Sequence, residues 1–153
     1  MIVRAAASVI PSAGPGTLAA AFVALTIVAP APTPAPPPVP LENTHWALVA
    51  VGGSAVNFGA AHGAFVLFRH GESGRFLGGT GGCNGLKGTY DTFVGRLRIN
   101  ASVLAGRPCP APLAGRETKL VEALRTTANY RIEGNTLALL AADGRVLARF
   151  KTP

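Results

Sequence analysis

A run of prolines constrains the fold of this chain more than any other feature. Residues 29–40 read APAPTPAPPPVP. Such a segment stays extended and exposes its backbone to water, so it cannot belong to a packed core. We interpret it as a spacer, which leaves roughly 110 residues from Leu41 onward to form a domain. That length is sufficient for one hydrophobic core but not for two.

The segment before the prolines has the features of a secretory signal peptide. It contains one basic residue, Arg4, and an uncharged apolar stretch at residues 17–29 that is short for a membrane span. We therefore predict a signal peptide at 1–31, a proline-rich linker at 32–40 and one domain at 41–153. No cysteine lies near the end of the stretch to carry a lipid, so we expect export to the periplasm or the cell exterior, without a lipid anchor and without a stable transmembrane span after processing. An uncleaved anchor is the alternative.

Short apolar runs that end at glycine or turn residues predict a mainly β domain. The runs lie at residues 46–51, 64–69, 75–78, 85–93, 96–100, 130–133, 136–141 and 145–150. Between the last three lie Gly134-Asn135 and Asp143-Gly144, which tolerate the positive φ of tight hairpin turns. We expect an α+β fold in which a strongly bent antiparallel sheet, or an incomplete β-barrel, packs on one helix.

The helix is predicted at about residues 113–128. Proline is tolerated at a helix start, and Pro110 and Pro112 precede this segment. Apolar residues recur on one face, at Leu113, Leu120, Val121 and Leu124. Charged residues lie largely off that face, at Arg116, Glu117, Lys119 and Glu122. We expect Leu120 and Leu124 to fill the concave side of the sheet.

The order of several short motifs resembles that of the META/HslJ domain of bacterial envelope proteins. The matching residues are Trp46, Gly82-Cys83-Asn84, Gly88, Tyr90, Cys109, Glu117, Leu120, Leu124, Tyr130, Ile132, Gly134, Leu137, Leu139, Asp143-Gly144 and Phe150. The match covers about 41–150, and we single out Trp46, Gly82, Asn84, Tyr90, Glu117 and Tyr130 as its structural motif. The chain departs from the family where a Thr-Arg pair is common, because Ala105-Gly106 stand there.

The resemblance implies a non-catalytic accessory domain associated with stress or antibiotic tolerance through binding. The alternative is a pilot-like or chaperone-like module that holds a peptide or an acyl chain in the concave face of the sheet. The partner would be an envelope protein or a lipid-like ligand. A preformed apolar groove would favour the alternative, whereas a cleft with a perturbed carboxylate or histidine would favour an enzyme.

The two cysteines, Cys83 and Cys109, are predicted to form a disulfide. Only one internal pairing is possible, and the leader implies a compartment in which disulfides persist. Glycine before Cys83 leaves room for close approach, and Pro108 and Pro110 stiffen the chain at Cys109. Two free cysteines packed as small apolar residues are the alternative.

The sequence shows no recognisable catalytic, cofactor or metal site. Gly79-x-Gly81-x-x-Asn84 lacks the third glycine of a dinucleotide fingerprint, and a predicted strand follows it where the fingerprint needs a helix. No Gly-x-Ser-x-Gly motif occurs, and the three histidines and two cysteines lack metal-ligand spacing. We therefore expect no enzyme activity, no cofactor and no metal.

The formal net charge of +7 invites a nucleic-acid interpretation. The arginines are nevertheless scattered singly through strand-like segments, with no basic run and no interleaved aromatic residues. We therefore expect no nucleic-acid partner. A basic soluble surface is the simplest interpretation, and attraction to anionic lipids or polymers of the envelope is the alternative.

Overall fold

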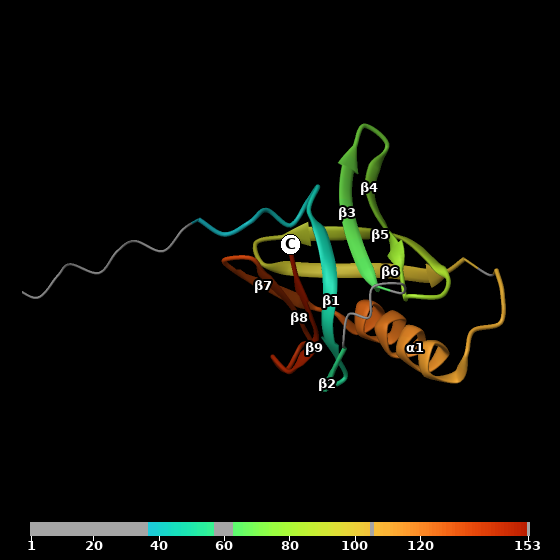
Figure 1. Ribbon diagram of the computed structural model, residues 1–153. Helices are drawn as coiled ribbons and strands as arrows, with labels where there is room; N and C mark the ends of the chain where they lie inside the picture. Colours follow the sequence, from blue (N-terminus) through green and yellow to red (C-terminus); the bar gives the residue numbers. More distant parts are fainter. Residues whose placement is uncertain (1–36, 57–62, 105, 153) are drawn as a thin grey trace, which may run out of the picture. The chain divides into compact units, whose positions relative to one another are not determined.

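The computed structural model describes residues 37–56, 63–104 and 106–152, which lie in one compact unit, Pro34–Pro153 (Figure 1). The predicted signal peptide and most of the predicted linker fall on residues 1–36, outside the described residues. At the end of the linker, Val39 packs against the core, and its N–H donates to the carbonyl oxygen of Gly134 at 3.1 Å. Ordered contacts of the domain therefore begin before Leu41.

The described chain forms nine strands and one helix. Their bounds are β1 His45–Val51, β2 Ser54–Ala55, β3 Phe65–Gly71, β4 Gly74–Thr80, β5 Gly85–Phe93, β6 Arg96–Val103, α1 Ala111–Thr126, β7 Asn129–Glu133, β8 Thr136–Leu140 and β9 Val146–Lys151. The strands pair antiparallel in the order β2-β1-β3-β4-β5-β6-β7-β8-β9, and β1 also pairs with β9. The sheet therefore curls into a partly closed ring, and the predicted mainly β fold with a bent sheet and one helix is confirmed.

Two glycines allow the sheet to bend where β3, β4, β5 and β6 meet. A Cβ atom added at Gly79 would collide with the backbone carbonyl of Phe65, and one added at Gly88 would collide with that of Asn100. Neighbouring strands approach too closely at both points for any side chain to fit between them. Glycine is the residue that permits such a close backbone approach.

The ring is weakly joined between β6 and β7, whose described residues form a single register pair, Arg96 with Asn129. Helix α1 packs beside the rest of β6 and compensates in part, because the Nε of Arg125 donates to the carbonyl oxygen of Ala101 at 2.7 Å. The helix therefore supplies a hydrogen bond to a strand edge that lacks a strand partner.

The observed helix corrects two details of the prediction. It begins and ends two residues earlier than expected, because Pro110 occupies the N-cap position and Thr127 is already extended. Glu117, predicted to lie largely off the buried face, is only 6 % exposed. Its partner, described below, comes from a turn that is distant in sequence, so helical periodicity could not reveal it.

The concave side of the sheet is filled by side chains. Leu120 and Leu124 of α1 are fully buried there, as predicted, against core residues that include Trp46, Phe68 and Phe150. The indole N–H of Trp46 donates to the carbonyl oxygen of Leu41 at 2.9 Å, so its one polar atom is satisfied. The peptide or acyl chain of the alternative function would have to displace this core to occupy the concave side.

Candidate functional site

The Gly-Cys-Asn motif forms a turn between β4 and β5 that is covalently tied to the entry of α1. Cys83 and Cys109 form the predicted disulfide, with Cα atoms 6.0 Å apart. The hydroxyl of Thr80 donates to the carbonyl oxygen of Asn84 at 2.8 Å and accepts from the N–H of Gly82 at 3.0 Å. Gly82 has a φ of 100°, a conformation that glycine adopts without strain.

Asn84 and Glu117 form the centre of this region. The backbone N–H of Asn84 donates to Oε2 of Glu117 at 2.8 Å, and its side-chain Nδ2 donates to Oε1 at 3.1 Å. Both oxygens of an almost buried carboxylate are therefore satisfied, as burial of such a group requires. A Cβ atom at Gly81 would collide with Glu117, so this glycine provides the space for the carboxylate.

The loop before α1 closes the same region from the other side. The N–H of Arg107 donates to Oδ1 of Asn84 at 3.3 Å, and Nδ2 of Asn84 lies 2.9 Å from Sγ of Cys109. The guanidinium of Arg107 also donates to the carbonyl oxygen of Cys83 at 3.4 Å. Asn84 thus links the turn, the helix and the loop. We call Gly82, Cys83, Asn84, Arg107, Cys109 and Glu117 the Asn84–Glu117 cluster.

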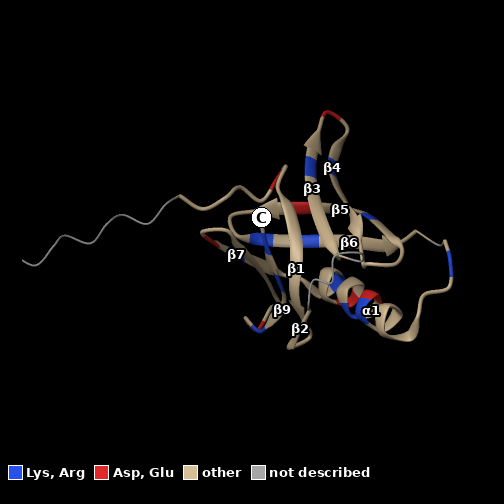
Figure 2. Ribbon diagram, in the orientation of Figure 1, with Lys and Arg blue, Asp and Glu red and all other residues tan. Residues whose placement is uncertain are grey.

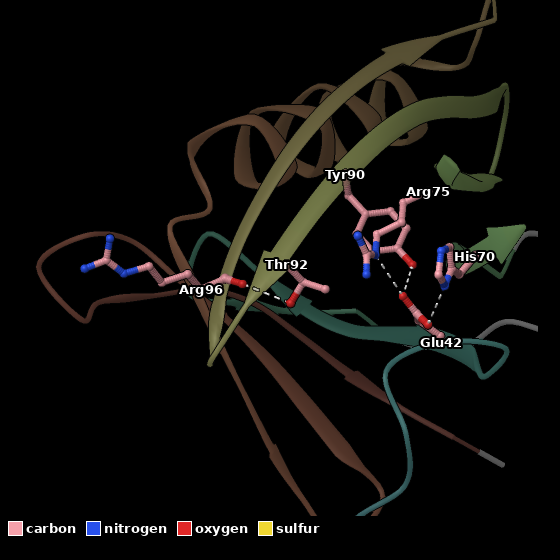
Figure 3. A network of polar contacts seen from close by, with 6 residues as sticks. All are labelled: Glu42, His70, Arg75, Tyr90, Thr92 and Arg96. Atoms are coloured by element: carbon pink, nitrogen blue, oxygen red, sulfur yellow. Dashed lines mark hydrogen bonds and ion pairs between the residues drawn. The ribbon is translucent and has the colours of Figure 1, made fainter. Parts of the chain in front are cut away.

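A second polar network lies at the other end of β4 and β5 (Figure 3). The hydroxyl of Tyr90 donates to Oε1 of Glu42 at 2.6 Å, and Nε of Arg75 lies 3.4 Å from the same oxygen. Nδ1 of His70 lies 4.0 Å from Oε2. The Tyr90 ring meets Phe68 edge-on, with ring centroids 5.1 Å apart, so the tyrosine joins this network to the core.

The environment moves the pKa values of Glu42 and Tyr90 in opposite directions. The hydrogen bond from Tyr90 is the largest cause of the lowered pKa of Glu42, and Arg75 and His70 lower it further. Burial raises the pKa of Tyr90, and the nearby Glu42 carboxylate raises it further. Near neutral pH the pair therefore consists of a carboxylate and a neutral phenol, a stable hydrogen bond with little tendency to transfer a proton.

Two further observations concern other kinds of site. Within residues 37–56, 63–104 and 106–152, no three His, Cys, Asp or Glu side chains are grouped so that they could hold a metal ion. In the same part of the chain, no helix has both the length and the apolar character needed to cross a membrane.

The model of the META domain family matches residues 39–153, which is most of the chain. The chain belongs to the META domain family. No curated protein matches it. Two solved structures share its fold. One NMR structure is 18% identical with a TM-score of 0.56, and covers 73% of this chain and 91% of its own. The NMR structure of a protein from Burkholderia xenovorans is 19% identical with a TM-score of 0.58. The match covers 84% of this chain and 99% of that protein's chain.

The structure of this META domain brings together only part of the predicted motif. Gly82, Asn84 and Glu117 meet in the Asn84–Glu117 cluster together with both cysteines. Trp46 lies in the core, Tyr90 joins the network of Glu42, and Tyr130 is half-buried against the core. These three stabilise the domain at separate places and form no common site.

Several contact residues of this META domain were not predicted. No sequence pattern indicates a role for the contact residues Glu42, His70, Arg75, Thr80 and Arg107. Glu42 and Tyr90 are 48 residues apart, so no local spacing connects them. The Thr-Arg pair common in the family is replaced by Ala105-Gly106, yet the neighbouring Arg107 still contacts the Gly-Cys-Asn turn.

Proposed function

We propose that this META domain is a non-catalytic accessory domain of the cell envelope that acts by binding and contributes to stress or antibiotic tolerance. The observation that carries the proposal is the Asn84–Glu117 cluster. Its carboxylate is the most buried acidic group described, and both of its oxygens are engaged by one asparagine. A carboxylate held in this way stabilises a turn and is poorly available as a base or nucleophile. The domain would therefore act through binding by its surface residues.

The proposed place of action is the periplasm or the cell exterior. META membership and the disulfide fit an envelope or exported protein. Disulfides persist in oxidising compartments and are rare in the cytosol. Residues 1–31 would direct the export, and without a lipid-carrying cysteine near them the mature protein would be free of a lipid anchor.

A complementation experiment tests the proposal. A strain that lacks the gene is supplied with the whole chain, with the chain without residues 1–31, or with an empty vector, and survival is counted after heat and after a cell-wall antibiotic. We expect only the whole chain to restore survival. Loss of the gene without any change in survival, or equal rescue by the leaderless chain, would contradict an envelope function.

A further inference from the structure

Two large apolar side chains are exposed next to each other at the tip of the β5–β6 hairpin. Phe93 is 78 % exposed and Val94 is 86 % exposed, more than any other large apolar residue of the described chain. Single exposed apolar residues are ordinary on protein surfaces, but an adjacent pair at a turn calls for an explanation. We refer to residues 93–96 as the hairpin tip.

The backbone of the hairpin tip is unsuited to valine. Phe93 pairs with Arg96, so Val94 and Gly95 form a two-residue turn, and their φ values are 45° and 78°. Positive φ at both positions is the pattern of a type I′ turn, which favours asparagine followed by glycine. A β-branched residue with positive φ is strained. Such strain typically lowers the equilibrium constant for folding about fivefold or more. Folding alone would therefore select asparagine at position 94.

Basic residues lie in the hairpin tip and in the strand next to it. The side chain of Arg96 extends away from the Glu42 network and forms no ion pair within the described chain (Figure 3). Strand β7 runs beside the tip, because the N–H of Tyr130 donates to the carbonyl oxygen of Gly95 at 2.9 Å. It carries Arg131, whose Nε lies 3.0 Å from Oε1 of the exposed Glu133.

The whole domain is positively charged, like the arginines in and next to the hairpin tip. Without Arg4, the chain has thirteen basic and seven acidic residues, a net charge of +6. Figure 2 shows basic residues along β6, the strand that leads away from the tip. A basic protein is attracted to an anionic bilayer surface. This attraction turns the apolar pair toward the acyl chains only if basic residues lie close to Phe93 and Val94.

We propose that the hairpin tip inserts Phe93 and Val94 into the interface of a membrane rich in anionic phospholipid, with Arg96 and Arg131 at the headgroups. This inference rests on the proposed function, because it names the partner of the binding domain. An aromatic and an aliphatic side chain supply apolar area, and neighbouring cations bind lipid phosphates. The stability lost at Val94 is then explained by a contact that forms outside the domain.

Sedimentation with vesicles tests this inference. Whole-chain protein is exported, purified and mixed with vesicles of phosphatidylcholine alone or with one-third phosphatidylglycerol. All variants share the same N-terminus, so any contribution from it cancels. Phe93→Ala should weaken partitioning into the anionic vesicles about tenfold. Arg96→Gln should weaken it about fivefold, with little effect on neutral vesicles. Phe76→Ala, which removes a half-exposed ring from β4, is the matched control and should leave partitioning into both kinds of vesicle unchanged.

Val94→Asn separates membrane binding from folding. It should weaken partitioning several-fold while raising the melting temperature, because asparagine suits the turn. A lowered melting temperature would refute the strain argument. Equal losses for Phe76→Ala and Phe93→Ala, or no vesicle binding by the parent chain, would overturn the inference. Self-association that Phe93→Ala abolishes would assign the tip to a second copy and overturn it as well. Survival in the complementation experiment judges the proposed function separately.

Discussion

Removal of the Asn84 side chain tests the structural role assigned to the Gly-Cys-Asn turn. Asn84→Ala deletes the 3.1 Å hydrogen bond to Oε1 of Glu117 and the 3.3 Å bond from the N–H of Arg107. Hydrogen bonds to charged groups contribute about 1.5–3 kcal/mol, and an unsatisfied buried group costs about 1–3 kcal/mol. We therefore expect the free energy of unfolding to fall by about 2–4 kcal/mol, with the disulfide intact.

Equilibrium unfolding in guanidinium chloride measures this loss. The matched control is Asn100→Ala, because Asn100 is exposed on β6 and its side chain has no partner in the described chain. That substitution should change the free energy by less than about 0.5 kcal/mol. A double-mutant cycle with Glu117→Gln should give a coupling of about 1–3 kcal/mol between the two side chains. A loss for Asn84→Ala no larger than that of the control would show that the Asn84 side chain does not stabilise the turn.

Three further predictions concern the core, the disulfide and the Glu42 network. Leu124→Ala should cost about 2–5 kcal/mol in thermal melts, because Leu124 is fully buried, and a cost near zero would show that this helix face is not packed. Reduction of the disulfide, which closes a separation of 26 residues, should cost about 3–4 kcal/mol, whereas two freely alkylated thiols in exported protein would contradict the bridge. The lowered pKa of Glu42 stabilises the fold above the ordinary glutamate pKa, and this stabilisation is lost as pH falls through the folded-state pKa. Tyr90→Phe removes the main cause, so the stability difference from the parent should shrink on acidification, and a difference independent of pH would contradict the assignment.

The sequence predicts those elements whose signal is local. Alternating runs and turn dipeptides locate the hairpins of β7, β8 and β9, and Gly134 and Gly144 have the positive φ expected of them. Strand β2 is missed, because its two residues, Ser54 and Ala55, are too few to show alternation.

Long-range contacts account for what the sequence could not predict at the candidate site. Helical periodicity assigns Glu117 to the solvent face, and only the fold shows that Gly81 leaves space for its carboxylate. The partner of Tyr90 lies in a different segment and has no spacing rule. The disulfide was predictable because two cysteines allow a single pairing.

We propose that the Asn84–Glu117 cluster stabilises the domain and performs no chemistry. Rescue of the gene-deletion strain by Glu117→Gln tests this most directly, with the folded amount of each protein measured in the same cells. Glutamine keeps the shape of the side chain but removes its charge, so it would abolish general-base or nucleophilic chemistry. We expect survival to follow the amount of folded protein and to be fully restored when the variant folds to the parent level. Folded Glu117→Gln at the parent level without restored survival would show that the Glu117 carboxylate does more than stabilise the domain.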